Sequence, residues 1–163
     1  MKKIGLLSLL ITISVLLIIT NIVKAEESKY KEKRLLVENL VNEAVEVIET
    51  KGQPAIDIIG DKNGKFNTKD TYVFVTSGET GADLINPAFK EIEGLPVEIY
   101  TDPVAKASQM AIVNAVKDKD TAWLEYLWPK PGETKPSKKI SYLRKIVING
   151  KVRIVGAGFY PEE

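Results

Sequence analysis

The sequence predicts an α+β domain, with a meandering antiparallel sheet and helices packed on one face. Two segments, residues 28–51 and 103–117, repeat apolar residues at the three- and four-residue spacing of helices. Other segments alternate or are rich in β-branched and aromatic residues, as strands are. The 163 residues include 44% hydrophobic residues, a composition that suits one ordinary globular domain.

The N-terminal 25 residues differ from the rest. The chain starts MKK, remains uncharged over residues 4–23, and reaches the small residue Ala25. This pattern predicts a signal peptide cleaved after Ala25. The alternative is a retained membrane anchor, because about 20 apolar residues can span a bilayer. Both interpretations export residues 26–163 to the periplasm or the extracellular space as one domain. Cleavage would remove three lysines and no acid, changing the formal net charge from +1 to −2.

The first segment, 28–51, is the clearest helix. Its apolar positions form one face and its charged residues take the other side. Gly52, with a proline close behind, predicts its end. A shorter helix or loop follows over 55–59. The second long helix begins at Asp102-Pro103, because Asp can cap free amide groups and proline suits the first helical position.

Five strands are predicted, over residues 71–76, 82–86, 121–128, 139–148 and 151–160. The loop after the first strand makes the first two an antiparallel hairpin. Asn149-Gly150 is the strongest hairpin signal, since both residues accept the positive φ of a type I′ turn. Prolines end the second and third of these strands.

Composition excludes several chemistries. The chain has no His and no Cys, which removes the usual zinc sites, Ser-His-Asp and Cys-His nucleophiles and thiol redox chemistry. The near-neutral charge argues against a nucleic-acid partner. No glycine-rich phosphate loop opens a helix, and the carboxylates show no diagnostic spacing. We therefore predict no cofactor, no metal ion and no catalytic residue.

Aromatic and cationic residues on two neighbouring strands predict a site for a small organic anion. A carboxylate needs one cation and one or two neutral donors in a partly dry cavity. Arg144 and Tyr142 lie two apart and share a face, so Arg144 could hold a carboxylate and Tyr142 could donate its hydroxyl. Tyr126 and Trp128 share a face of the preceding strand and would form a wall, if the strands pair in a suitable register.

Each of these residues also has a structural interpretation. Tyr126 and Trp128 could be core aromatics, and Arg144 could pair with a surface acid. Lys139 is out of phase with Tyr142. It would join the site only through a bulge or from the loop end, and it could otherwise be a surface lysine.

Four blocks of sequence resemble, in the right order, the signature blocks of single Cache domains of the second type. They are TYVFVT…GADLINP (71–87), WLEYLWPKPG (123–132), KKISYLRK (138–145) and VGAGFY (155–160). The middle of the chain departs from the family pattern, because EGLPVEIYTDP (93–103) stands where the family has an EGKNL stretch.

The resemblance implies a PAS-like fold: a long N-terminal helix and a second helix packed on a five-stranded antiparallel sheet, with a small-molecule pocket between the sheet and the segments crossing it. It gives Asn86 a role in that pocket, whereas Asn86 before Pro87 could also simply end the strand. Family ligands are small carboxylates such as acetate, propionate, lactate or pyruvate. The expected role is extracytoplasmic sensing in chemotaxis or other signal transduction, with a membrane receptor or kinase as partner. Membrane contact is expected only if the N-terminal segment stays uncleaved. The alternatives are an exported structural or interaction module without a ligand, and a carboxylate-based hydrolase.

Overall fold

The computed structural model describes residues 28, 30–68 and 71–161. The predicted signal peptide or anchor, residues 1–25, lies outside the described residues. No helix in the described part of the chain is long and apolar enough to span a bilayer. Contacts divide the chain into two units, Met1–Leu35 and Leu36–Glu163. The architecture below is that of the second unit.

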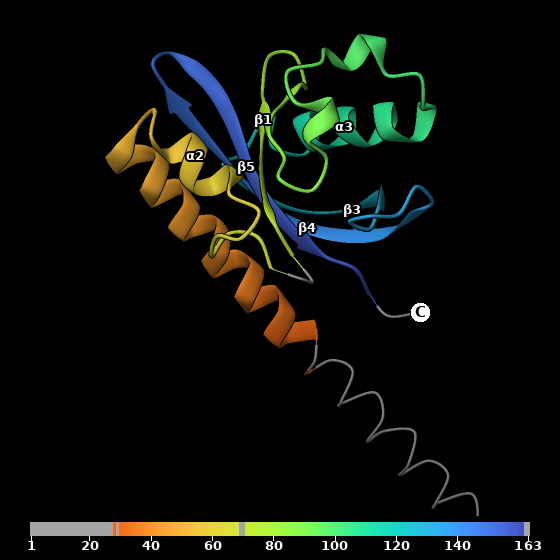
Figure 1. Ribbon diagram of the computed structural model, residues 1–163, viewed down its shortest axis with the longest axis horizontal. Helices are drawn as coiled ribbons and strands as arrows, with labels where there is room; N and C mark the ends of the chain where they lie inside the picture. The colour runs from red at the N-terminus through yellow and green to blue at the C-terminus, as the bar shows by residue number, and fades with distance from the viewer. Residues whose placement is uncertain (1–27, 29, 69–70, 162–163) are drawn as a thin grey trace, which may run out of the picture. The chain divides into compact units, whose positions relative to one another are not determined.

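A five-stranded antiparallel sheet forms the centre of this unit (Figure 1). Its spatial order is β2-β1-β5-β4-β3. The strands are β1 (Val73–Ser77), β2 (Asp83–Ile85), β3 (Thr121–Pro129), β4 (Pro136–Ile148) and β5 (Lys151–Phe159). The predicted α+β fold is confirmed. Strand β4 begins earlier than predicted, because residues 136–138 pair with the end of β3.

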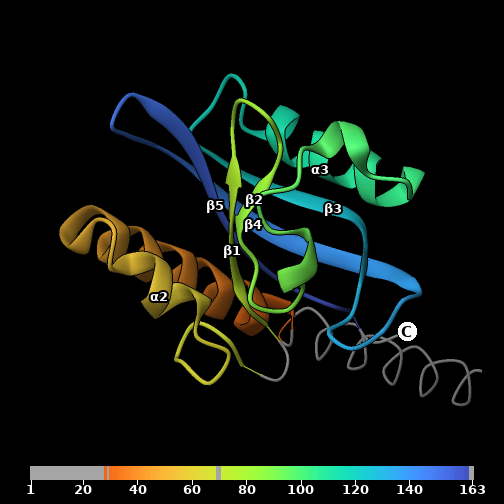
Figure 2. The same ribbon diagram turned by 45° about the horizontal axis from the view of Figure 1, so that its top comes forward.

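Helices cover both faces of the sheet, so the prediction that they share one face is wrong (Figures 1 and 2). A long helix extends over residues 30–51, followed by α2 (Ala55–Gly60) and, later, α3 (Pro103–Ala115). On β4, Leu143 packs in a core cluster with Ile112 of α3, whereas the next residue, Arg144, bonds to Asn42 of the long helix. Successive strand residues point to opposite faces. Alternate side chains of β4 therefore contact α3 on one face of the sheet and the long helix on the other.

Two local predictions are confirmed at the ends of elements. Asp102 caps α3, because its Oδ1 accepts the backbone N–H of Val104 at 2.8 Å, and Pro103 takes the first helical position. Asn149 and Gly150 join β4 to β5 with φ values of 52° and 73°. Both values are those that a type I′ turn requires.

The segment between β2 and α3 crosses the α3 face of the sheet. It contains two short 3₁₀ turns, η1 (Lys90–Ile92) and η2 (Val97–Ile99), which the sequence did not predict. Phe89 and Ile92 pack against the core cluster on this face. The backbone N–H of Gly94 donates to the Asp83 carbonyl at 2.7 Å, which ties the segment back to β2. We call residues 86–102 the crossing segment.

Candidate ligand-binding site

A small cavity lies on the α3 face, between the sheet, α3 and the start of the crossing segment. It encloses about 10 Å³, room for about one water molecule. Its lining combines aromatic and apolar walls with four buried polar or charged side chains, Asp83, Asn86, Gln109 and Lys139. The lining residues are Tyr72, Phe74, Asp83, Asn86, Gln109, Ile112, Tyr126, Trp128 and Lys139. We call it the inner cavity.

Lys139, on β4, supplies the positive charge of the inner cavity and is only 1% exposed. Its Nζ lies 4.0 Å from the centre of the Tyr72 ring and 5.1 Å from that of Phe74. It also lies 5.5 Å from the centre of the Tyr160 ring, so three aromatic rings surround this ammonium. Such contacts favour a cation, yet burial lowers the pKa of Lys139 from 10.5 to about 7, against the opposing effect of Asp83. The protonated, charged form of Lys139 is therefore less stable in the inner cavity than it would be in water.

Asp83, on β2, is the buried acid of the inner cavity, and its carboxylate oxygens already have donors. Thr76 donates its hydroxyl to Oδ1 at 2.8 Å, and Asn86 donates its amide N–H to Oδ2 at 2.7 Å. Burial raises the pKa of the Asp83 carboxyl, with these hydrogen bonds opposing the shift. The Asn86 carbonyl accepts the N–H of Phe89 at 3.2 Å. Asn86 thus connects Asp83 to the crossing segment.

Neutral polar groups complete the inner cavity. The Tyr126 hydroxyl lies 3.1 Å from Ser141 Oγ, and burial raises the pKa of Tyr126 far above its usual value. Tyr72 and Gln109 are each 1% exposed. Their Oη and Oε1 atoms are buried without a hydrogen-bond partner among the described residues. An unsatisfied buried polar atom costs about 1–3 kcal/mol, so these two atoms mark a place suited to a polar ligand.

Two glycines of β5 make room for this arrangement. Gly158 pairs with Ser141, and Gly156 pairs with Leu143, on the same face of the sheet as the inner cavity. A Cβ atom at Gly158 would meet Ser141 Oγ and lie 3.0 Å from Lys139 Cε. A Cβ atom at Gly156 would meet the Phe74 ring. Close packing around Lys139 therefore requires glycine at these positions.

Four of the six predicted site residues line the inner cavity: Tyr126, Trp128, Lys139 and Asn86. The prediction that Tyr142 and Arg144 share their face is wrong.

The register explains the difference, because Tyr126 pairs with Lys139, whereas Trp123 pairs with Tyr142. Tyr142 stacks on Trp123, with ring centres 5.3 Å apart. The Arg144 guanidinium donates to Asn42 Oδ1 at 2.8 Å on the long-helix face. Lys139 takes the place expected for Arg144, without any bulge.

The sequence interpretation missed Tyr72, Phe74, Asp83 and Gln109. Two of them carry a recognisable signal. Asp83 interrupts an otherwise apolar strand, and Gln109 falls on the apolar side of α3, one turn before Ile112. A polar residue on a buried face needs a partner, so these two positions could have been singled out. Among the described residues, no cluster of acids has the arrangement of a metal site.

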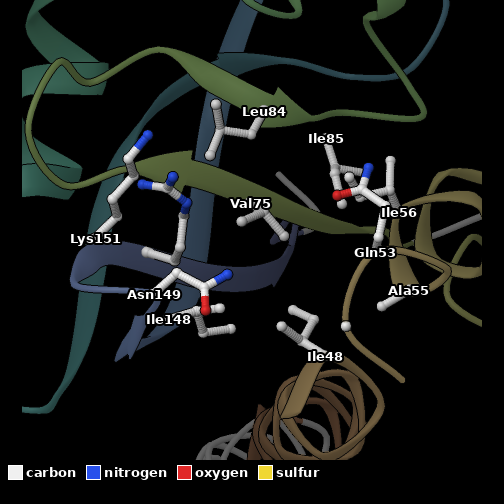
Figure 3. Close-up of a pocket in the computed structure, with 12 residues that line it drawn as sticks. Ile48, Gln53, Ala55, Ile56, Val75, Leu84, Ile85, Ile148, Asn149 and Lys151 are labelled. Atoms are coloured by element: carbon white, nitrogen blue, oxygen red, sulfur yellow. The ribbon is translucent and has the colours of Figure 1, made fainter. Parts of the chain in front are cut away.

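A larger hollow of about 460 Å³ lies on the long-helix face (Figure 3). Apolar side chains surround it, including Ile48, Val75 and Ile85. Its charged neighbours lie near the β4–β5 turn, where Arg153 already pairs with Glu79 at 3.2 Å. This hollow is larger than the inner cavity, but none of the described residues that line it buries a charge.

Comparison with known proteins identifies the family. A family model described as the Cache domain matches residues 62–163. A solved Cache chemosensory domain, studied for carboxylic acid recognition, is 25% identical, with a TM-score of 0.64 over 83% of this chain and 98% of its own.

Two further solved structures share the fold. One is a methyl-accepting chemotaxis protein from Vibrio parahaemolyticus, which is 18% identical, with a TM-score of 0.65 over 85% of this chain and 95% of its own. The other is the periplasmic sensor domain of a chemotaxis protein, which is 23% identical, with a TM-score of 0.58 over 83% of this chain and 96% of its own. The five-stranded sheet with a helix on each face and a family match over more than half of the sequence confirm the PAS-like fold predicted above: the chain belongs to the Cache domain family.

Proposed function

We propose that this chain is an extracytoplasmic sensor domain whose inner cavity binds the carboxylate of a small organic anion. One observation carries the proposal: a fully buried lysine ammonium is surrounded by aromatic rings, beside two buried polar atoms without partners. Burying a charge without a hydrogen-bonded counter-ion is costly. A carboxylate at Lys139 would supply that counter-ion and a strong charge-assisted hydrogen bond.

The lining residues suit distinct roles. Lys139 would bind one carboxylate oxygen, and the Tyr72 hydroxyl, which lacks a partner, would donate to the other. Tyr126 would add a second donor, shared with Ser141. Trp128 would cover the ligand as an apolar wall. Asp83 would not touch the ligand, because its donors hold both oxygens, and it would instead fix Asn86.

The structure of a Cache chemosensory domain studied for carboxylic acid recognition supports this ligand class. Acetate, propionate, lactate and pyruvate are the first candidates. Asp83 is the only carboxylate in the lining of the inner cavity. Because its oxygens are occupied, the site is suited to binding rather than to acid–base catalysis.

Occupancy would be reported through the crossing segment. Even a two-carbon carboxylate is larger than the water-sized space of about 10 Å³ in the inner cavity, so its binding requires side chains to move. The Asn86 side-chain carbonyl accepts the backbone N–H of Phe89. A shift at Asn86 would therefore move the crossing segment, and a membrane receptor or kinase would detect that movement as partner.

A thermal-shift screen tests the proposal. Purified protein from residue 26 onward is screened against mono- and dicarboxylates of two to six carbons, because a ligand that binds only the folded state raises Tm. We expect a rise for at least one monocarboxylate, and no rise for Lys139→Met. Lys151→Met, beside the hollow on the other face, is the matched control and should respond as the parent does.

A response that survives Lys139→Met unchanged would contradict the site. No response to any carboxylate, with activity on a hydrolase panel, would favour the enzyme alternative. The mass of the exported protein tests the N-terminal proposal, since a chain beginning at Glu26 rules out a retained anchor.

A further inference from the structure

A second hollow on the α3 face lies beside the inner cavity. It encloses about 280 Å³ and is lined mainly by apolar side chains. They include Phe89, Ile92, Leu95, Ile99, Ala105 and Trp128. We call it the outer cavity. Leu95 and Ile99 are 38% and 58% exposed, so the outer cavity opens to solvent past apolar side chains.

Aromatic side chains connect the linings of the two cavities. Trp128 lines both of them. The Phe89 ring meets Trp128 edge-on, with centres 5.9 Å apart, and lies 6.3 Å from the ring of Tyr72, which lines the inner cavity. Because Phe89 belongs to the crossing segment, the partition moves if that segment moves.

Three buried polar atoms without partners lie toward the inner side of this partition. Tyr72 Oη and Gln109 Oε1 belong to residues that line the inner cavity. Tyr100 lines the outer cavity, but its Oη is near enough to Gln109 and Asp83 for both to influence its pKa. None of the three has a hydrogen-bond partner among the described residues. Unpaired polar atoms at the inner cavity therefore lie next to the apolar space of the outer cavity, with the Phe89–Trp128 pair between them. A ligand with a polar head and an apolar tail requires this arrangement.

The charge of the outer cavity narrows the ligand class. Among the described residues, its lining includes one acid, Asp102, and no cation. A second carboxylate at the far end of a ligand would lose part of its water among apolar side chains and would lie near the acid Asp102. The outer cavity therefore disfavours dicarboxylates.

We propose that the ligand is a monocarboxylate with a hydrocarbon tail, whose head binds at Lys139 and whose tail passes Trp128 into the outer cavity. This inference rests on the proposed function and names its ligand class. Displacement of the Phe89–Trp128 contact opens the path, since the inner cavity is too small for the tail. Each methylene that leaves water in the outer cavity should tighten binding about fourfold.

Calorimetric titration with acetate, propionate, butyrate, valerate and hexanoate tests the inference. We expect affinity to rise about fourfold per methylene from propionate until the outer cavity is full. Adipate should bind at least about tenfold more weakly than hexanoate, because its second carboxylate would be desolvated.

Filling the outer cavity with a larger side chain should remove the gain in affinity that a longer tail provides. Ala105→Phe places a ring in the outer cavity and should abolish the advantage of hexanoate while acetate changes by less than about threefold. Met110→Phe, on the same helix and 42% exposed, is the matched control and should bind like the parent. If Ala105→Phe fails to fold by circular dichroism, Leu95→Asp serves instead, because an acid beside the tail should weaken hexanoate selectively.

The outcomes separate this inference from the proposed function. If acetate or lactate binds best, with binding lost in Lys139→Met, the proposed function stands and the tail assignment is wrong. Equal affinity for hexanoate and adipate, or equal weakening of acetate and hexanoate by Ala105→Phe, also overturns the inference. If no carboxylate binds the parent protein, both fail.

Discussion

The hollows on the two faces of the sheet differ in character. The long-helix face has about 460 Å³ surrounded by apolar side chains, with its cations near the β4–β5 turn (Figure 3). The α3 face has only about 10 Å³ in the inner cavity, yet that cavity contains a buried lysine and a buried aspartate. The proposed function assigns the ligand to the smaller of these two hollows, because desolvated charge and unpaired polar atoms are what a binding site needs and a packing gap lacks.

Replacing the buried cation should have the largest effect. Lys139→Met removes the charge but keeps an unbranched side chain, and carboxylate affinity should fall by about 2–5 kcal/mol. The variant without ligand should be at least as stable as the parent near neutral pH, because a poorly solvated charge is gone. Calorimetry and urea unfolding measure the two effects. Loss of binding by Lys151→Met instead would assign the site to the other face.

Binding should also depend on pH. The pKa of Lys139 is lowered to about 7, so above pH 7 the free protein loses the proton that a carboxylate ligand needs. Affinity should then fall about tenfold per pH unit, or about 1.4 kcal/mol. Below pH 7 it should be level until Asp83, whose pKa is raised, and the ligand take up protons.

The same shift predicts the pH dependence of stability. The unfolded chain retains the usual Lys pKa of 10.5, so it binds more protons than the folded chain between pH 7 and 10.5. The contribution of Lys139 to the free energy of unfolding therefore rises with pH through that window.

Calorimetric titrations of a carboxylate ligand at pH 6, 7, 8 and 9 would show the predicted fall in affinity. An affinity that stays constant from pH 7 to 9 would contradict protonated Lys139 as the ligand's partner.

Crowding the floor of the inner cavity should cost less. Gly158→Ala places a Cβ against Ser141 and near Lys139 Cε, so the free energy of unfolding should fall by about 1–3 kcal/mol. Carboxylate binding should weaken as well, since Lys139 must shift. Val147→Ala, at a β4 position that is 66% exposed, is the control and should change stability by less than about 0.5 kcal/mol. Unchanged stability in Gly158→Ala would show that Ser141 and Lys139 can move to accommodate the added Cβ atom, and would contradict the close packing described around Lys139.

Arg144→Ala should have the smallest effect on binding. Its guanidinium bonds to Asn42 on the long-helix face, so the variant should lose about 1 kcal/mol of stability and bind carboxylates within about twofold of the parent. Tyr142→Phe should behave similarly in binding. A tenfold loss of affinity in either variant would restore these residues to the site and contradict the separation of the two faces.

Local chemistry made much of the fold predictable. The Asn149-Gly150 turn, the Asp102 cap and the helical periodicity all depend on neighbouring residues. The site depends on which residues oppose each other across strands, and a shift of one residue reverses the face of every side chain. Tyr126 meets Lys139 only because Pro129 pairs with Pro136 across the connecting loop. No short sequence pattern specifies that register, so the sequence predicts both Arg144 and Lys139 at one site, although the pairing places them on opposite faces.

The hydrogen bonds around Asp83 have a further consequence for local opening. The crossing segment contains little regular structure, yet its Phe89 amide donates to Asn86 and its Gly94 amide donates to the Asp83 carbonyl. Both amides should therefore exchange with solvent deuterium more slowly than those of an ordinary loop, because opening them breaks bonds to the Asp83 backbone and to Asn86, which holds the buried Asp83 carboxylate. Their exchange rates would then change together when the site is occupied, which makes the segment one cooperative unit with the sheet.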